Sequence, residues 1–144
     1  MIRRATADDV EEIARLYERS FATLDFLPVL HTLDEHRWWF ARQLAEHEGW
    51  VWDENGVRGF IVLTESELLY IYLDVGWTGR GIGSALLDHA KQRRRDGFTL
   101  WTFQQNVSAR RFYERHEFVA VEFTDGEGNE EKTPDVRYEW KPSA

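Results

Sequence analysis

The 144-residue sequence contains no cysteine, which excludes disulfides, cysteine-ligated metal sites and a thiol nucleophile. It also lacks any apolar run near the roughly 20 residues that a membrane-spanning helix needs. The polar segment that follows residues 1–4 gives no sign of a signal peptide. We therefore expect a soluble, cytoplasmic protein with no membrane partner.

Basic residues are fewer than acidic ones, with 18 Lys and Arg against 26 Asp and Glu, and the formal net charge is −8. Non-specific binding of nucleic acid depends on a basic surface, so we expect no nucleic-acid partner. An acidic protein would instead suit a cationic or amine-bearing substrate. The five histidines are scattered without the spacing of metal ligands, and we expect no metal.

Hydrophobic residues make up 42% of the chain and aromatic residues 15%, enough for a substantial core at this length. The patterns predict strands at residues 2–5, 50–53, 57–63, 68–75, 98–103, 118–124 and 136–140. They predict helices that begin near Thr6, Thr32, Ile82 and Asn106, the first three of which end near Ser20, Gly49 and Gly97.

The most informative stretch is residues 68–90, where an apolar strand leads through a glycine-rich turn into a helix. The first turn of a helix has unsatisfied N–H groups and a partial positive charge, and glycines let backbone approach an anion closely. This pattern favours a phosphate-bearing ligand at residues 78–84. The alternative is that the glycines only permit a tight turn.

Two common phosphate motifs do not fit this turn. No Lys follows the glycines, as a P-loop would require. The dinucleotide fingerprint fails as well, because its third glycine would fall on Ser84 or on Leu86.

Other segments leave alternatives open. The basic run at residues 91–95 either complements the helix dipole or contacts a nucleotide phosphate. Trp38, Trp39 and Phe40 either pack on two sides of their helix or wall a substrate pocket, and we favour packing for most of them. The acidic pair Glu130 and Glu131 is expected to stay solvated.

The glycine turn resembles the acetyl-CoA pyrophosphate loop of the GNAT N-acetyltransferase superfamily, with Thr78 where the family usually has Gln or Arg. A second family motif follows, in which Asn106, Ala109, Tyr113 and Phe118 stand in register. Glu117 departs from it, because the family usually has Gly before this Phe and uses it to turn the helix into the next strand. The order of the elements matches the family over essentially the whole chain.

This resemblance implies a single GNAT domain over residues 1–144. Its fold class would be α/β (α+β), a mixed, twisted central sheet of about six to seven strands flanked by about four helices. A homodimer is an expected partner state, because dimers are frequent in the family.

The resemblance also implies acetyl-CoA as cosubstrate, with its diphosphate on the turn and its pantetheine arm between two strands that splay apart. The residues expected to bind it are Leu73, Asp74, Val75, Thr78, Gly79, Arg80, Gly81, Ile82, Gly83, Ser84, Asn106, Ala109 and Tyr113.

A substrate amine would attack the thioester directly. Tyr113 would then protonate the departing thiolate as general acid, and the backbone N–H of Leu73 would stabilise the oxyanion. The alternative for Tyr113 is core packing. Phe26, His31 and Tyr72 are expected to contact the acceptor. The general base stays open among five side chains, namely Glu65, Tyr70, Tyr72, Asp74 and His31.

Two other functions compete with this hypothesis. One is a non-catalytic acyl-CoA sensor or interaction module on the same fold, which the departures at Thr78 and Glu117 would favour. The other is an unrelated nucleotide-binding enzyme that uses the glycine turn. The acceptor, a small molecule or a peptide amine, cannot be named from the sequence.

Overall fold

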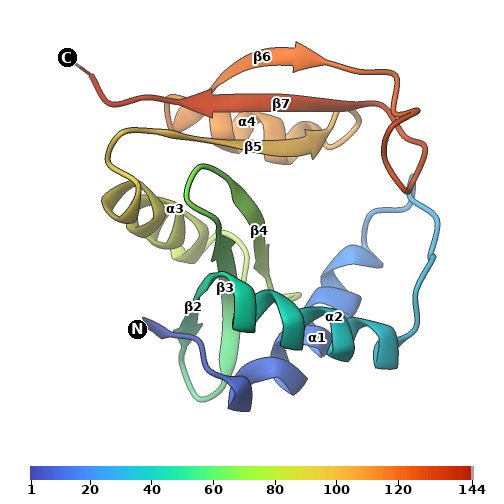
Figure 1. Cartoon of the computed structure of the whole chain (residues 1–144), viewed down its shortest axis with the longest axis vertical. Coiled ribbons are helices and arrows are strands. Elements are labelled where there is room, and N and C mark those ends of the chain that lie inside the picture. Colours follow the sequence, from blue (N-terminus) through green and yellow to red (C-terminus); the bar gives the residue numbers. More distant parts are fainter. Residues whose placement is uncertain (144) are drawn as a thin grey trace.

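The computed structural model describes residues 1–143 and has the predicted order of elements (Figure 1). Its strands are β1 (Ile2–Arg4), β2 (Glu48–Asp53), β3 (Val57–Leu63), β4 (Leu68–Leu73), β5 (Phe98–Phe103), β6 (Val119–Phe123) and β7 (Asp135–Trp140). Its α-helices are α1 (Val10–Phe21), α2 (Leu33–Glu46), α3 (Ile82–Arg93) and α4 (Val107–Arg115). The predicted α+β class is confirmed.

The strands form two antiparallel sheets that meet at one point. The first has the order β1-β2-β3-β4 and the second has the order β5-β7-β6. A single parallel bridge between Glu67 and Thr99 links them, and the Thr99 N–H donates to the Ser66 carbonyl at 3.0 Å. From this bridge onward β4 and β5 pair no further, so the two sheets part along the length of β4 (Figure 1).

Strand β3 separates two hydrophobic clusters because its side chains alternate between the two faces of the sheet. Ile61 and Leu63 join the cluster that includes α3 and the second sheet. Phe60 and Val62 join the cluster beneath α1 and α2. The first sheet is therefore covered by helices on both faces, and its outer strand β4 borders the gap.

Helix α2 has the predicted capping box at its start. The Thr32 hydroxyl accepts from the Glu35 N–H at 3.2 Å, and the Glu35 carboxylate accepts from the Thr32 N–H at 2.8 Å. The expected end near Gly49 is wrong, because α2 ends at Glu46 and Gly49 lies in β2. A Cβ at Gly49 would lie 2.4 Å from Leu44 Cδ2, so the glycine lets this strand pack against the helix.

Strand β4 ends at Leu73, two residues before the predicted end at Val75. The chain turns there because the Asp74 carboxylate accepts from the Val75 N–H at 2.9 Å and the Asp74 carbonyl accepts from the Trp77 N–H at 3.0 Å. The first helical segment begins after Thr6 as predicted, with its first turn a 3₁₀ turn (Ala7–Asp9) that leads into α1, and the Asp9 carboxylate accepts from the Thr6 N–H at 2.8 Å.

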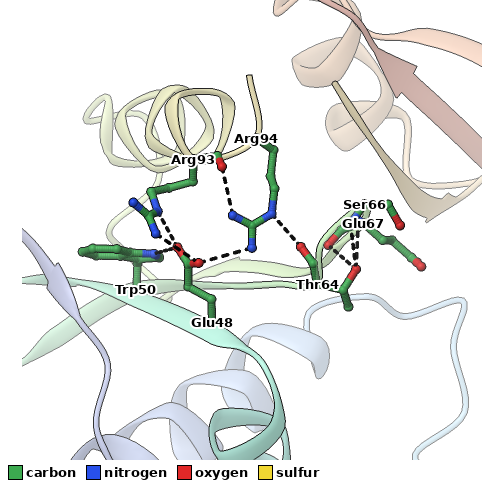
Figure 2. A network of polar contacts seen from close by, with 7 residues as sticks. All are labelled: Glu48, Trp50, Thr64, Ser66, Glu67, Arg93 and Arg94. Carbon is green, nitrogen blue, oxygen red and sulfur yellow. Dashed lines mark hydrogen bonds and ion pairs between the residues drawn. The ribbon is translucent and has the colours of Figure 1, made fainter. Parts of the chain in front are cut away.

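Three of the four basic side chains at residues 91–95 make contacts within the described part of the protein, and Figure 2 shows those of Arg93 and Arg94. Arg93 and Arg94 both pair with Glu48 of β2, at 2.6 and 3.2 Å, and the Arg94 guanidinium also donates to the Thr64 carbonyl at 2.7 Å. Lys91 donates to the His116 carbonyl at 2.6 Å. These three side chains tie the end of α3 to β2 and to the residues that follow β3 and α4, which favours the structural interpretation over contact with a nucleotide.

Candidate active site

A cavity of about 450 Å³ lies between the parted strands β4 and β5 and reaches the first turn of α3 and one face of α4. Ten of the residues predicted for the site line it, namely Tyr72, Leu73, Thr78, Gly79, Gly81, Gly83, Ser84, Asn106, Ala109 and Tyr113. The two sequence motifs, which lie on different elements, therefore face one space. We call this space the cleft.

The backbone of Leu73 faces the cleft rather than β3. Leu73 lies opposite Gly59 in the antiparallel ladder, and the neighbouring Asp74 N–H donates to the Arg58 carbonyl at 2.8 Å. Hydrogen-bonded and non-hydrogen-bonded pairs alternate in such a ladder, so Leu73 and Gly59 exchange no hydrogen bonds. The Leu73 N–H therefore points away from β3, toward the gap that β5 leaves open.

The glycine turn leaves the start of α3 uncapped. Gly79 and Gly81 have φ of 76° and 84°, in the left-handed region that favours glycine. Gly81 occupies the N-cap position without a side-chain cap, and a Cβ on either glycine would meet nothing within 4 Å. Within residues 1–143 the N–H groups of Ile82, Gly83 and Ser84 have no protein acceptor. They remain available to an anion.

On the far side of the cleft lie Asn106, the N-cap residue of α4, and Tyr113 of α4. The Asn106 side-chain oxygen accepts from the Ala109 N–H at 3.2 Å, which confirms the predicted cap, and Asn106 lines the cleft. Tyr113 is 7% exposed, and no hydrogen bond of its hydroxyl is found in the described chain. Burial, with Tyr72 nearby, raises the pKa of Tyr113 above its ordinary value of 10, so the phenol keeps its proton at neutral pH.

Several predicted residues have side chains outside the cleft lining. The Asp74 carboxylate forms a two-pronged ion pair with Arg19 of α1, with both contacts at 3.0 Å. Val75 is exposed, Ile82 is buried in the core, and the Arg80 guanidinium lies 4.6 Å from the Trp77 ring. Any part that these residues play in cofactor binding would therefore use the backbone.

The predicted acceptor contacts are separated. Tyr72 lines the cleft, Phe26 packs edge-on against Phe103 at 6.2 Å between ring centroids, and His31 lines a second cavity of about 440 Å³. This second space, the aromatic cavity, lies between α1, α2 and the β6–β7 loop. It is lined by Tyr17, Phe21, Pro28, Val29, Leu30, His31, Glu35, His36, Trp38, Trp39, Tyr70, Glu130 and Glu131.

At the aromatic cavity, the structure differs in part from the expectations for the acidic pair at residues 130–131 and for the aromatic residues of α2. Glu130 stays exposed as expected, although it pairs with His31, whereas Glu131 is half-buried in the cavity wall. Of the α2 aromatics, Phe40 packs in the core as favoured, whereas Trp38 and Trp39 line the cavity.

Sequence reasoning also missed residues that line the cleft. Ser108, Phe112 and Arg115 do so from α4, and their spacing of i, i+4 and i+7 on one helix face was a signal that could have found them. Ser20 of α1 and the residues Thr23 and Leu24, which follow this helix, also line the cleft, and they carried no such signal because the chain after α1 is irregular.

Across residues 1–143, no group of three or more His, Asp or Glu side chains is placed to hold a metal ion. In the same range, no helix combines the length and hydropathy of a membrane span.

Comparison with known proteins places the chain among acetyltransferases. A family model described as the acetyltransferase (GNAT) domain matches residues 44–120, more than half of the chain. The 5-NmdU N-acetyltransferase of Pseudomonas phage PaMx11 is 31% identical over 89% of this chain and 94% of the phage protein. An N-acetyltransferase of Methanocaldococcus jannaschii is 27% identical over 87% of this chain, which spans 63% of that relative.

Among solved structures, the acetyltransferase yncA from Salmonella typhimurium, determined with its cofactor acetyl-CoA, superposes with a TM-score of 0.74. The match covers 100% of this chain and 94% of that chain at 20% identity, and it shows a shared fold.

Proposed function

The chain belongs to the GNAT family of N-acetyltransferases, and we propose that it transfers the acetyl group of acetyl-CoA to a primary amine by direct attack within the cleft. The observation that carries the proposal is the convergence of the glycine turn, the free edge of β4 and Tyr113 on one space between parted strands. That convergence brings an anion site, an oxyanion donor and a proton donor together.

In this proposal the diphosphate of acetyl-CoA binds the free N–H groups at the start of α3, where the helix dipole favours negative charge. Arg115 lines the cleft and supplies a cation for the phosphates. The pantetheine arm lies along β4, in the place that a further strand would occupy. Its amides pair with the backbone groups of β4 that β3 does not use, and the Asn106 amide holds it from the other side.

The reaction then needs two contacts at the thioester. The amine nitrogen attacks the carbonyl carbon while the Leu73 N–H donates to the developing oxyanion. The carbon–sulfur bond breaks, and the phenol of Tyr113 passes its proton to the leaving thiolate. The attacking nitrogen, now bonded to the acetyl carbon, loses its surplus proton, which returns through water to the Tyr113 phenolate. The products are the acetylated amine and free CoA.

The attacking amine must first lose a proton, and the structure narrows the choice of base. Of the five candidates only Tyr72 lines the cleft, and burial raises the pKa of Tyr72 above its ordinary value of 10. Asp74 is held by Arg19. A phenol that stays protonated is a poor base at neutral pH, so we assign removal of this proton to water that enters the cleft with the amine.

The test is a transfer assay with purified protein, radiolabelled acetyl-CoA and a panel of polyamines, amino acids, aminoglycosides and peptides. We expect amine-dependent release of CoA together with an acetylated product identified by mass spectrometry. CoA binding without transfer to any amine would favour the sensor alternative. Tighter binding of ATP or NAD than of CoA would favour an unrelated nucleotide-binding enzyme.

A further inference from the structure

The aromatic cavity adjoins the cleft across a wall of tyrosines. The rings of Tyr17 and Tyr72 lie 4.8 Å apart between centroids, and those of Tyr70 and Tyr72 lie 6.3 Å apart. Tyr72 lines the cleft, whereas Tyr17 and Tyr70 line the aromatic cavity. The two spaces are therefore neighbours, with the Tyr72 ring packed against the tyrosines of the aromatic cavity.

The walls of the aromatic cavity present ring faces and edges from three elements. Tyr17 and Phe21 come from α1, Trp38 and Trp39 from α2, and Tyr70 from β4. The Trp39 indole N–H donates to the Tyr70 hydroxyl at 2.7 Å, which fixes both rings. Trp38 and Trp39 remain 60% and 41% exposed. Exposure of two neighbouring large aromatic side chains to water is unfavourable, and such a patch marks a place where a ligand or partner binds.

The charged groups that face this cavity are three carboxylates and one imidazole. His31 contacts both Glu130 and Glu35, and these carboxylates raise the pKa of His31 above its ordinary 6.5, with Glu130 the larger cause. His36 stays neutral at neutral pH because burial lowers its pKa. The two carboxylates beside His31 are therefore partly neutralised.

Glu131 is the third carboxylate that lines the aromatic cavity. Its side chain is half-buried in the cavity wall, and within residues 1–143 it takes part in no hydrogen bond or ion pair. Its negative charge reaches the tyrosine wall, where it adds to burial in raising the pKa of Tyr17 and Tyr70. An unpaired carboxylate at a partly desolvated site attracts a cation strongly.

Aromatic faces and a free carboxylate together suit an alkylammonium ion. The ammonium gains a cation–π interaction with the rings and an ion pair with Glu131, while the methylene stem packs on the apolar walls. A neutral or anionic group would leave Glu131 without a partner. The net charge of −8 also attracts a polycation from solution.

We propose that the aromatic cavity binds a second ammonium group of the acceptor, so that the acceptor is an aliphatic diamine or polyamine. This inference rests on the proposed function, because the reacting amine must reach the thioester in the cleft. One amine is held at Glu131, and the alkyl chain passes Tyr72 so that the other amine lies near Leu73 and Tyr113.

The first test compares matched acceptors in the transfer assay. Linear diamines of increasing length are set against monoamines of the same length and against amino acids that carry a carboxylate at the far end. We expect kcat/KM for the best diamine to exceed that of its monoamine by at least about tenfold, the size of one charge-assisted contact. The amino acid should be poorer still. Equal values for diamine and monoamine would overturn the inference while leaving the proposed function intact.

The second test measures binding without chemistry. Calorimetric titration of the protein with the best diamine, in the absence of acetyl-CoA, is expected to show a Kd about tenfold weaker in Glu131→Gln. Glu127→Gln is the matched control, because Glu127 is exposed in the same loop and does not line the aromatic cavity. Circular dichroism checks that both variants are folded. An unchanged Kd in Glu131→Gln would contradict the site.

The outcomes separate the two proposals. Binding of the diamine that depends on Glu131, without acetylation of any amine, would contradict the proposed function but not the cation site. Acetylation of a lysine peptide with a higher kcat/KM than any free diamine would overturn the inference and point to a protein acceptor.

Discussion

Leu73 faces Gly59 across the β3–β4 ladder at a position where neither residue bonds to the other, and this turns the Leu73 N–H into the cleft. The pair is also tightly packed. A Cβ at Gly59 would lie 2.7 Å from Leu73 Cδ2, 3.1 Å from Leu86 Cδ1 and 3.3 Å from the Tyr72 carbonyl. Gly59 thus lets the side chains of Leu73 and of Leu86 in α3 pack closely on β3 beside the cleft.

Gly59→Ala is expected to lower the free energy of unfolding by about 1–3 kcal/mol, the usual cost of overpacking a core. Because the added methyl group displaces Leu73, affinity for CoA should fall as well. Urea denaturation and CoA titration measure the two effects. Gly128→Ala serves as the control, since a Cβ at Gly128 meets nothing within 4 Å. Wild-type stability in Gly59→Ala would show that Leu73 and α3 shift freely.

Glu48 should make the free energy of unfolding depend on pH in the acid range. Burial opposes its ionisation, but hydrogen bonds from Arg93, Trp50 and Arg94 outweigh burial and lower the pKa of Glu48 to about 2 (Figure 2). A lowered pKa contributes stability that is present above the ordinary pKa of 4.5 and lost as the pH falls toward 2. The shift corresponds to roughly 3 kcal/mol at neutral pH.

Glu48→Gln is therefore expected to destabilise the protein by roughly 3 kcal/mol at pH near 7. The difference between variant and wild type should shrink between about pH 4.5 and 2. Urea denaturation across that range measures it, and taking the difference cancels the other carboxylates. A gap between the two proteins that stays constant with pH would show that the Glu48 network does not stabilise the charged form.

Glu117 occupies a conformation that favours glycine. Its φ is 73°, at the junction where α4 turns toward β6, and a left-handed backbone costs about 1 kcal/mol or more for a residue with a Cβ. Glu117→Gly should raise the free energy of unfolding by about 1 kcal/mol in thermal or urea denaturation. Glu117→Ala removes the carboxylate and keeps the Cβ, so it should show no such gain. Equal stabilisation by both would assign the effect to charge.

Much of the fold was predictable because its signals are local. Strands β3 and β5 have the predicted bounds, since turn residues punctuate both apolar runs. The caps at Thr32 and Asn106 depend on residues three positions away and were also predictable. Glu117 stands where the family usually has Gly, and its φ of 73° lies in the left-handed region that favours glycine.

The aromatic cavity was not predictable, because its parts meet only in the folded chain. His31 and Glu130 are 99 residues apart in sequence, and Arg19 and Asp74 are 55 apart. Short polar loops such as the one that carries Glu131 look solvated from sequence, and only the packing of α1, α2 and β7 decides what they cover. The end of β4 was missed for a similar reason, since the Asp74 side chain competes for the backbone there.

The most direct test of the account is the rate of acetyl transfer by Tyr113→Phe, measured together with the Kd of CoA. The hydroxyl makes no hydrogen bond within residues 1–143, so its removal should leave the fold intact. We predict that kcat falls by about 100-fold or more, the usual contribution of a general acid, while the Kd of CoA stays within about twofold. An unchanged kcat would contradict the role of Tyr113 as the proton donor in the cleft.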